Sequence, residues 1–199
     1  MSSFHAIWTV SRTLQQILWE AFDADTVLRN VVGSAAAIVL SNPTEVQRDP
    51  ANRLSLWLYQ VTENEYVKNQ LPTRSTADNR IELPPLALNL FYLVTPFAGP
   101  AEADQLLLGK TMQVLYDNAI VAVRNVPDRD FEELRIVLCR LTLEELTRIW
   151  EALREPYRLS VCYQIRVTHI DSERDIGRAR VIDRIASIGD TPSAPEVAP

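Results

Sequence analysis

The run Leu86–Thr95 reads LALNLFYLVT, and it decides the class of fold to which the chain belongs. Apolar side chains occupy both of the faces that alternate along this run, with Asn89 as the main interruption. A strand that is apolar on both faces lies inside a sheet that is covered on two sides. Pro96, Gly99 and Pro100 follow and end the run. We therefore predict a central β-strand here.

A second run of the same kind, Leu54–Glu63, reads LSLWLYQVTE. Strand alternation divides its apolar side chains into two groups, with Leu54, Leu56 and Leu58 on one face and Trp57, Tyr59 and Val61 on the other. Because both groups are apolar, this run predicts a second central strand that is covered on two sides.

A third strand pattern, Tyr157–Ile170, is long and alternates regularly between apolar and mostly polar side chains. One face of this strand is therefore expected at solvent or at an interface. It exceeds the usual strand length of about 5–6 residues, so it is expected to extend beyond the body of the sheet. Further strands are predicted at Ala35–Leu40, Arg135–Leu141 and Arg180–Ile188, although the spacing of the last also permits a helix.

Helical periodicity predicts three helices around this sheet. The first covers Phe4–Phe22, and the second runs from Pro100 to about Val123. The third covers Thr142–Leu153 and begins with a capping box, because a threonine is followed three residues later by Glu145. The predicted fold class is α+β (mixed α/β), a single domain over 1–188 with a central, mostly antiparallel or mixed sheet and about three flanking helices. The Pro-rich residues 189–199 are predicted to be a disordered tail.

Composition describes a globular chain with no obvious reason to bind phosphates. Of its 199 residues, 47% are hydrophobic and 23% are charged, and its net charge is −6. An acidic chain repels nucleic-acid backbones on average, so neither nucleic acid nor a membrane is an expected partner. No run approaches the ~18 apolar residues of a membrane span, and no targeting signal is visible, so we expect assembly in the cytoplasm.

The residue types that carry catalysis are sparse and scattered. His5 and His169 are the two histidines, and neither has cysteine or carboxylate neighbours at metal-ligand spacing. Gly109-Lys110-Thr111 lacks the upstream glycine that a phosphate-binding loop needs. Cys139 and Cys162 lie in apolar, strand-like runs and are expected to be buried free thiols. We predict no enzymatic activity, no cofactor and no metal site.

The remaining features suggest a protein that works through contacts with other proteins. Trp8, Arg12 and Trp19 lie together on one face of the first helix, which suits recognition; alternatively, the tryptophans only widen the core stripe. The loop within 68–85 carries Arg74 and is also expected to touch a partner. The other candidate interface residues are polar positions of the Tyr157–Ile170 strand and the segment after it, namely Arg158, Gln164, Arg166, Thr168, Arg180, Ile182 and Arg184.

Three stretches of the chain resemble signatures of a known family. They are Leu56–Asn64 (LWLYQVTEN), Leu83–Pro96 (LPPLALNLFYLVTP) and Leu106–Lys110 (LLLGK). The Thr142–Leu153 helix, followed by the run from Tyr157 to Tyr163, fits the same pattern. In these stretches the chain resembles the cap, or tail-terminator, proteins of extracellular contractile injection systems, such as those of the Photorhabdus virulence cassettes and the antifeeding prophage.

This resemblance implies a tail-terminator-like fold and a structural role. Subunits of such a cap form a ring, expected to be a hexamer, at the end of the particle distal to the baseplate. The ring terminates the inner tube and the sheath and couples them, so the implied partners are further copies of the chain and the sheath and tube proteins. The resemblance leaves open whether the particle acts inside or outside the bacterium. The alternative function is a monomeric protein-binding or regulatory module that uses the Trp8/Arg12/Trp19 face.

Overall fold

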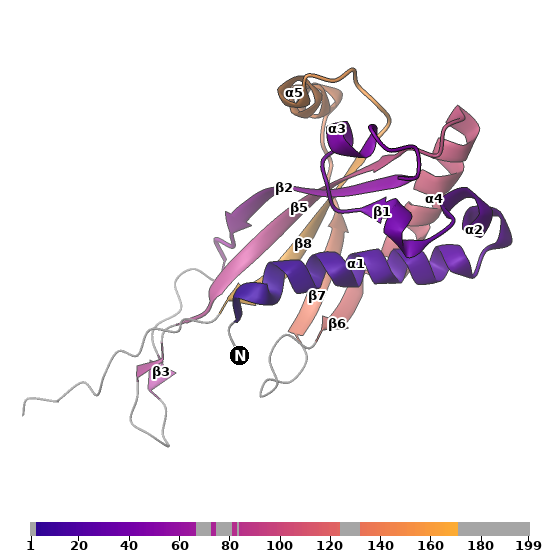
Figure 1. Cartoon of the computed structure of the whole chain (residues 1–199). Coiled ribbons are helices and arrows are strands. Elements are labelled where there is room, and N and C mark those ends of the chain that lie inside the picture. Colours follow the sequence, from indigo (N-terminus) through magenta and orange to yellow (C-terminus); the bar gives the residue numbers. More distant parts are fainter. Residues whose placement is uncertain (1–2, 67–72, 75–80, 83, 124–131, 171–199) are drawn as a thin grey trace, which may run out of the picture.

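The computed structural model of the chain describes residues 3–66, 73–74, 81–82, 84–123 and 132–170 (Figure 1). Its main feature is a six-stranded sheet in the order β1-β2-β5-β8-β7-β6. The strands β1 and β2 run parallel, and every other neighbouring pair is antiparallel. The bounds, in sheet order, are Ile38–Val39, Leu54–Glu63, Leu86–Pro96, Val161–Ile170, Glu132–Leu138 and Ile120–Val123. The predicted α+β fold with a mixed sheet is confirmed.

The run that opened the sequence analysis, β5, lies in the middle of this sheet between β2 and β8. Leu90 and Leu93 point to opposite faces of β5, and both are fully buried. The apolar character of both faces is explained by this burial, because each face of the strand is removed from water. The prediction of two adjacent central strands is confirmed, since β2 pairs with β5 over most of its length.

An irregularity in β2 changes which face its last residues occupy. Leu58 pairs with Tyr92, whereas the next paired residue, Gln60, lies opposite Phe91, so Tyr59 is an extra residue in the ladder. Such a β-bulge shifts the alternation by one position. As a result Val61 lies opposite the buried Leu90, on the face of Leu56. The predicted grouping of Val61 with Trp57 and Tyr59 is therefore wrong.

Three helices pack against one face of the sheet and enclose the core. They are α1 (Ala6–Asp23), α2 (Thr26–Val32) and α4 (Ala101–Asp117), as Figure 1 shows. A short 3-10 turn, Ser3–His5, precedes α1, so the first predicted helix is confirmed. The buried stripe of α1 contains Val10, Leu14, Leu18 and Phe22, and it joins the central strands in a single hydrophobic cluster.

The helix α5 (Leu143–Leu153) lies apart from this layer in Figure 1, and a further short helix, α3 (Pro43–Val46), precedes β2. Its predicted capping box is present, because Glu145 N donates to Thr142 Oγ1 and Thr142 N donates to the Glu145 carboxylate. The bond from Thr142 N, together with a second one that Thr142 Oγ1 donates to the same carboxylate, lowers the pKa of Glu145 below its ordinary value. Trp150 attaches α5 to the segment before β8, because its side chain is buried and its Nε1 donates a hydrogen bond to Ser160 Oγ at 3.2 Å.

Several predicted boundaries differ from the structure. The second helix ends at Asp117, because Asn118 closes it with two bonds to the Val114 carbonyl and the following residues form β6. The run at 35–40 divides into a 3-10 turn (Ala35–Ala37) and the two-residue β1. The strand predicted from Tyr157 begins at Val161. The helices α2 and α3 were not predicted.

Some predictions concern segments that lie outside the described residues. The segment Arg180–Ile188, the tail 189–199 and most of the loop 68–85 belong to this group. Within that loop, β3 (Thr73–Arg74) and β4 (Ile81–Glu82) form a separate antiparallel pair. In the described part of the chain, none of the helices is long and apolar enough to cross a membrane.

Candidate functional site

The first candidate surface lies on the N-terminal half of α1. Trp8 is 61% exposed, and the Arg12 guanidinium lies 5.9 Å from the centre of its ring. Arg12 Nη1 donates to Gln15 Oε1 at 2.7 Å, and Gln15 Nε2 in turn donates to the carbonyl of Ile38 in β1. The exposed Trp8–Arg12 pair is therefore connected to the sheet edge through Gln15, which holds it in a defined position. We call this pair the helix surface.

The third member of the predicted face behaves differently. Trp19 is only partly exposed and packs against the hydrophobic cluster. The two interpretations of this face thus each describe part of it: Trp8 and Arg12 are available to a partner, whereas Trp19 widens the core stripe. Phe4, which is exposed and stacks on His5, adds further apolar area at the same end of α1.

Arg158 lies before β8 and already has partners inside the chain. Its guanidinium is 4.6 Å from the centre of the Phe97 ring, and its Nη2 lies 3.6 Å from Asp104 Oδ2. Asp104 also accepts a 2.6 Å bond from the amide of Ala98. Arg158 therefore joins the approach to β8 to the start of α4, and any contact with a partner would be added to this internal role.

The other predicted residues on β8 are Gln164, Arg166 and Thr168. Gln164 and Arg166 belong to one face, where Arg166 Nε donates to Gln164 Oε1 at 3.1 Å. β8 pairs with β5 as far as Ile170, but its pairing with β7 reaches only Arg166. Thr168 lies opposite Leu88, and Arg74 belongs to β3. Arg180, Ile182 and Arg184 fall outside the described residues.

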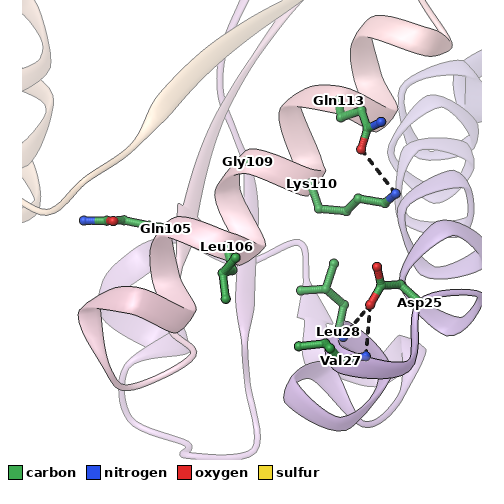
Figure 2. Close-up of a pocket in the computed structure, with 8 residues that line it drawn as sticks. All are labelled: Asp25, Val27, Leu28, Gln105, Leu106, Gly109, Lys110 and Gln113. Atoms are coloured by element: carbon green, nitrogen blue, oxygen red, sulfur yellow. Dashed lines mark hydrogen bonds between the residues drawn. The ribbon is translucent and has the colours of Figure 1, made fainter.

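The structure adds a groove that sequence reasoning missed. It lies between α2 and α4 and has a volume of about 540 Å³ (Figure 2). Val27 and Leu106 are apolar residues of this groove that are 60% and 58% exposed. The other lining residues are Asp25, Leu28, Gln105, Gly109, Lys110 and Gln113.

The groove is shaped by how α2 begins and by a glycine in α4. Asp25 Oδ1 accepts bonds from the amides of Val27 and Leu28, at 2.9 and 3.1 Å, and so caps α2 (Figure 2). A Cβ atom at Gly109 would meet nothing within 4 Å, so this glycine leaves open space along α4. Lys110 Nζ donates to Gln113 Oε1 at 3.2 Å and brings a positive charge to the groove.

The family-like run LLLGK is divided between this groove and the core. Leu107 and Leu108 are buried, whereas Leu106, Gly109 and Lys110 line the groove. Core burial accounts for only part of the run, and the rest faces a space that another molecule could fill. The sequence feature that could have indicated this groove is an apolar residue, Leu106, and a glycine, Gly109, on the outer side of a predicted helix.

Catalytic chemistry has little support in the described residues. Among them, no group of three or more His, Cys, Asp or Glu side chains is arranged to hold a metal ion. His5 stacks on Phe4, and His169 lies in β8 opposite Ala87. The features that stand out are surfaces: an exposed aromatic–arginine pair at one end of α1 and an apolar groove near the other.

The comparison with protein families gives a match over most of the chain. Residues 9–184 match the family described as the Pvc16 N-terminal domain. Among curated proteins, none gives a significant match.

Two cryo-EM structures share the fold of this chain. The sheath/tube terminator of PVC, an extracellular contractile injection system, in its extended state, gives a TM-score of 0.58 at 16% identity, over 89% of this chain and 63% of that chain. The anti-feeding prophage cap, an AFP tube terminating cap, gives a TM-score of 0.51 at 15% identity, over 78% of this chain and 53% of that chain. The present chain thus spans less than two thirds of either protein.

Proposed function

Because this chain belongs to the Pvc16 N-terminal domain family, we propose that it is a structural cap subunit of a contractile injection particle. In this role it terminates the inner tube and the sheath at the baseplate-distal end and couples them. The observation that carries the proposal is the family match over residues 9–184, together with a fold similar to a sheath/tube terminator and a tube terminating cap. A catalytic role is not part of the proposal.

The subunits are proposed to close into a ring, expected to be a hexamer. A ring requires two different surfaces on each subunit, one of which contacts the other surface on the next copy. The helix surface and the α2–α4 groove suit this requirement, because they lie near opposite ends of α1 (Figure 1). α1 has 18 residues, which corresponds to a length of about 27 Å.

The two surfaces also complement each other chemically. The exposed Trp8 ring of one copy offers apolar area to Val27 and Leu106 of the next. The groove carries both a negative charge, on Asp25, and a positive charge, on Lys110, so the apolar contact and not charge pairing with Arg12 supports this match. Aromatic and arginine side chains are the residues that most often dominate binding energy at interfaces. We therefore assign the second copy, through its helix surface, as the occupant of the groove.

Contacts with the tube and sheath proteins are proposed for other parts of the chain. Gln164 and Arg166 on β8 offer polar groups that would suit such contacts. Arg74 in β3 remains a predicted contact. Thr168 and the residues Arg180, Ile182 and Arg184 remain predicted contacts of the same kind. We propose that assembly takes place in the bacterial cytoplasm and that the protein then remains a component of the particle, without nucleic-acid or membrane partners.

The experiment that tests this function combines the mass of the purified protein in solution with electron microscopy, with and without tube and sheath proteins. A closed ring, alone or on tube ends, is the expected result. A monomer that closes into a ring only on a tube end would equally support it. A monomer that binds neither tube nor sheath would overturn the proposal and leave the binding module as the explanation of the exposed Trp8 and Arg12.

A further inference from the structure

The two cysteines of the chain lie opposite each other on neighbouring antiparallel strands. Leu138 of β7 pairs with Tyr163 of β8, and the next position brings Cys139 opposite Cys162. The Cys139 amide donates a hydrogen bond to the Cys162 carbonyl, with 2.8 Å between N and O. Side chains of directly opposite residues share a face of the sheet. The two thiols, which are far apart in the sequence, therefore lie side by side.

This arrangement has the spacing that a disulfide needs. Opposite residues in a hydrogen-bonded antiparallel pair have Cα atoms about 5.5 Å apart. Disulfides join residues whose Cα atoms lie about 4.4–6.8 Å apart. Both thiols are free, and they already share a side-chain hydrogen bond. The main chain thus needs little movement for a covalent bond to form between the sulfur atoms.

The surroundings give the two thiols different properties. Cys162 is 2% exposed, and the Tyr59 hydroxyl lies 3.2 Å from its sulfur. Hydrogen bonds from Cys139 and Tyr59 lower the pKa of the Cys162 thiol, against the effect of burial. The bond to Cys162 and burial both raise the pKa of the Cys139 thiol, which is the more exposed of the two. Cys162 is therefore the more acidic of the two thiols, and Cys139 is the sulfur that solvent molecules reach first.

We propose that Cys139 and Cys162 form an oxidation site, which a small-molecule disulfide converts into an intramolecular cross-strand disulfide. Access decides the first step, because the buried Cys162 cannot reach a small disulfide in solution. The more exposed Cys139 loses its proton to solvent, and its sulfur attacks one sulfur of the small disulfide and expels the first half as a thiolate. The Cys162 thiolate then attacks the Cys139 sulfur and expels the second half. Two protein thiols are oxidised and one small disulfide is reduced to two thiols, which take up the two protons that the protein thiols lose.

The new bond would act on the connection between the sheet and α5. Cys139 directly follows β7, and the chain between the two cysteines contains all of α5. Oxidation closes this segment into a covalent loop and prevents β7 from separating from β8 at that end. This inference is independent of the proposed ring, since it concerns bonds within one chain.

The test uses the full chain, fully reduced and then exposed to oxidised glutathione at pH 8. We expect both thiols to become unreactive after denaturation, the mass to fall by two hydrogen atoms, and peptide mapping to find Cys139 joined to Cys162. The rate should not depend on protein concentration. Retention of both thiols, glutathione adducts without the crosslink, or links between chains on a non-reducing gel would each overturn the proposal.

Two variants test the order of the steps. Cys162→Ser should stop the reaction at a single glutathione adduct on Cys139. Tyr59→Phe removes one hydrogen bond to the Cys162 sulfur, so the mixed adduct should persist several times longer before the crosslink forms. Tyr116→Phe, on the exposed surface of α4, is the matched control and should react like the unmodified chain. Equal lifetimes of the adduct in Tyr59→Phe and Tyr116→Phe would contradict the assignment of Cys162 as the second nucleophile.

Discussion

The hydroxyl groups of Ser11 and Tyr92 lie 2.7 Å apart and share a buried hydrogen bond. Ser11 belongs to α1 and Tyr92 to the central strand β5, so this bond joins the helix layer to the middle of the sheet. Ser11 Oγ also donates to the Ile7 carbonyl at 3.1 Å, which leaves Tyr92 as the donor in the shared bond. The pair fixes how α1 is rotated on the sheet, and thereby the direction in which Trp8 and Arg12 point.

Tyr92→Phe removes this bond while keeping the ring in the core. We expect the free energy of unfolding to fall by about 1 kcal/mol, the usual contribution of such a bond. Urea denaturation followed by circular dichroism measures the change. Tyr116→Phe, at an exposed position on α4, should change the stability very little. A loss as large in Tyr116→Phe as in Tyr92→Phe would show that the measured effect is not due to the buried bond.

Stability should also decline at high pH in a way that depends on Tyr92. Burial raises the pKa of Tyr92 to about 12, from the ordinary tyrosine value of 10.0. Because the folded pKa is the higher one, the contribution of the neutral phenol is complete below about pH 10 and is lost as pH rises through about 12. Urea midpoints measured from pH 8 to 11.5 should fall less steeply in Tyr92→Phe. Burial also raises the pKa of Tyr163 to about 12, so part of the decline should remain.

Trp8→Ala and Trp19→Ala should separate binding from folding. Trp8 is exposed, so its loss should change the free energy of unfolding by less than about 0.5 kcal/mol. The same change should weaken ring formation at least tenfold, because the proposed contact loses its aromatic group. Trp19 packs against the core, and its truncation should cost about 2–4 kcal/mol. Thermal unfolding and analytical ultracentrifugation measure the two effects, and a Trp8→Ala protein that assembles normally would contradict the proposed contact.

Gly109 offers a graded test of the groove. Gly109→Ala should stabilise the chain by about 0.5–1 kcal/mol, since alanine favours the helix and its Cβ meets nothing within 4 Å. Gly109→Leu keeps the helix but fills part of the groove with a bulky side chain. We expect Gly109→Ala to form rings and Gly109→Leu to remain monomeric with an intact fold, as judged by sedimentation and circular dichroism. Normal rings in Gly109→Leu would mean that the groove is not the subunit contact.

Much of the fold followed from the periodicity of the sequence because burial is imposed in a regular way. The strands Leu54–Glu63 and Leu86–Pro96 were predicted because they are apolar on both faces, as central strands are, and α1 was predicted because its apolar residues recur at helical spacing. The capping box at Thr142 was equally readable, since both partners of its hydrogen bonds lie within one turn.

The parts that could not be predicted depend on contacts between distant segments. The bulge at Tyr59 appears only in the pairing of β2 with β5, and it reverses the face of Val61. The strand β6 continues an apolar helical pattern and becomes a strand because β7 pairs with it. The groove and the Cys139–Cys162 pair likewise arise from helices and strands that meet only in the folded chain.

The two outer strands of the sheet are both short: β1 has 2 residues and β6 has 4. A long, straight border would offer a row of free amide and carbonyl groups to which a further sheet could attach. β1 covers only Leu54 and Ser55 of β2, so among the described residues the free border continues along β2 from Leu56 to Glu63. The amide and carbonyl groups of this border offer a place where a strand of another chain could add to the sheet.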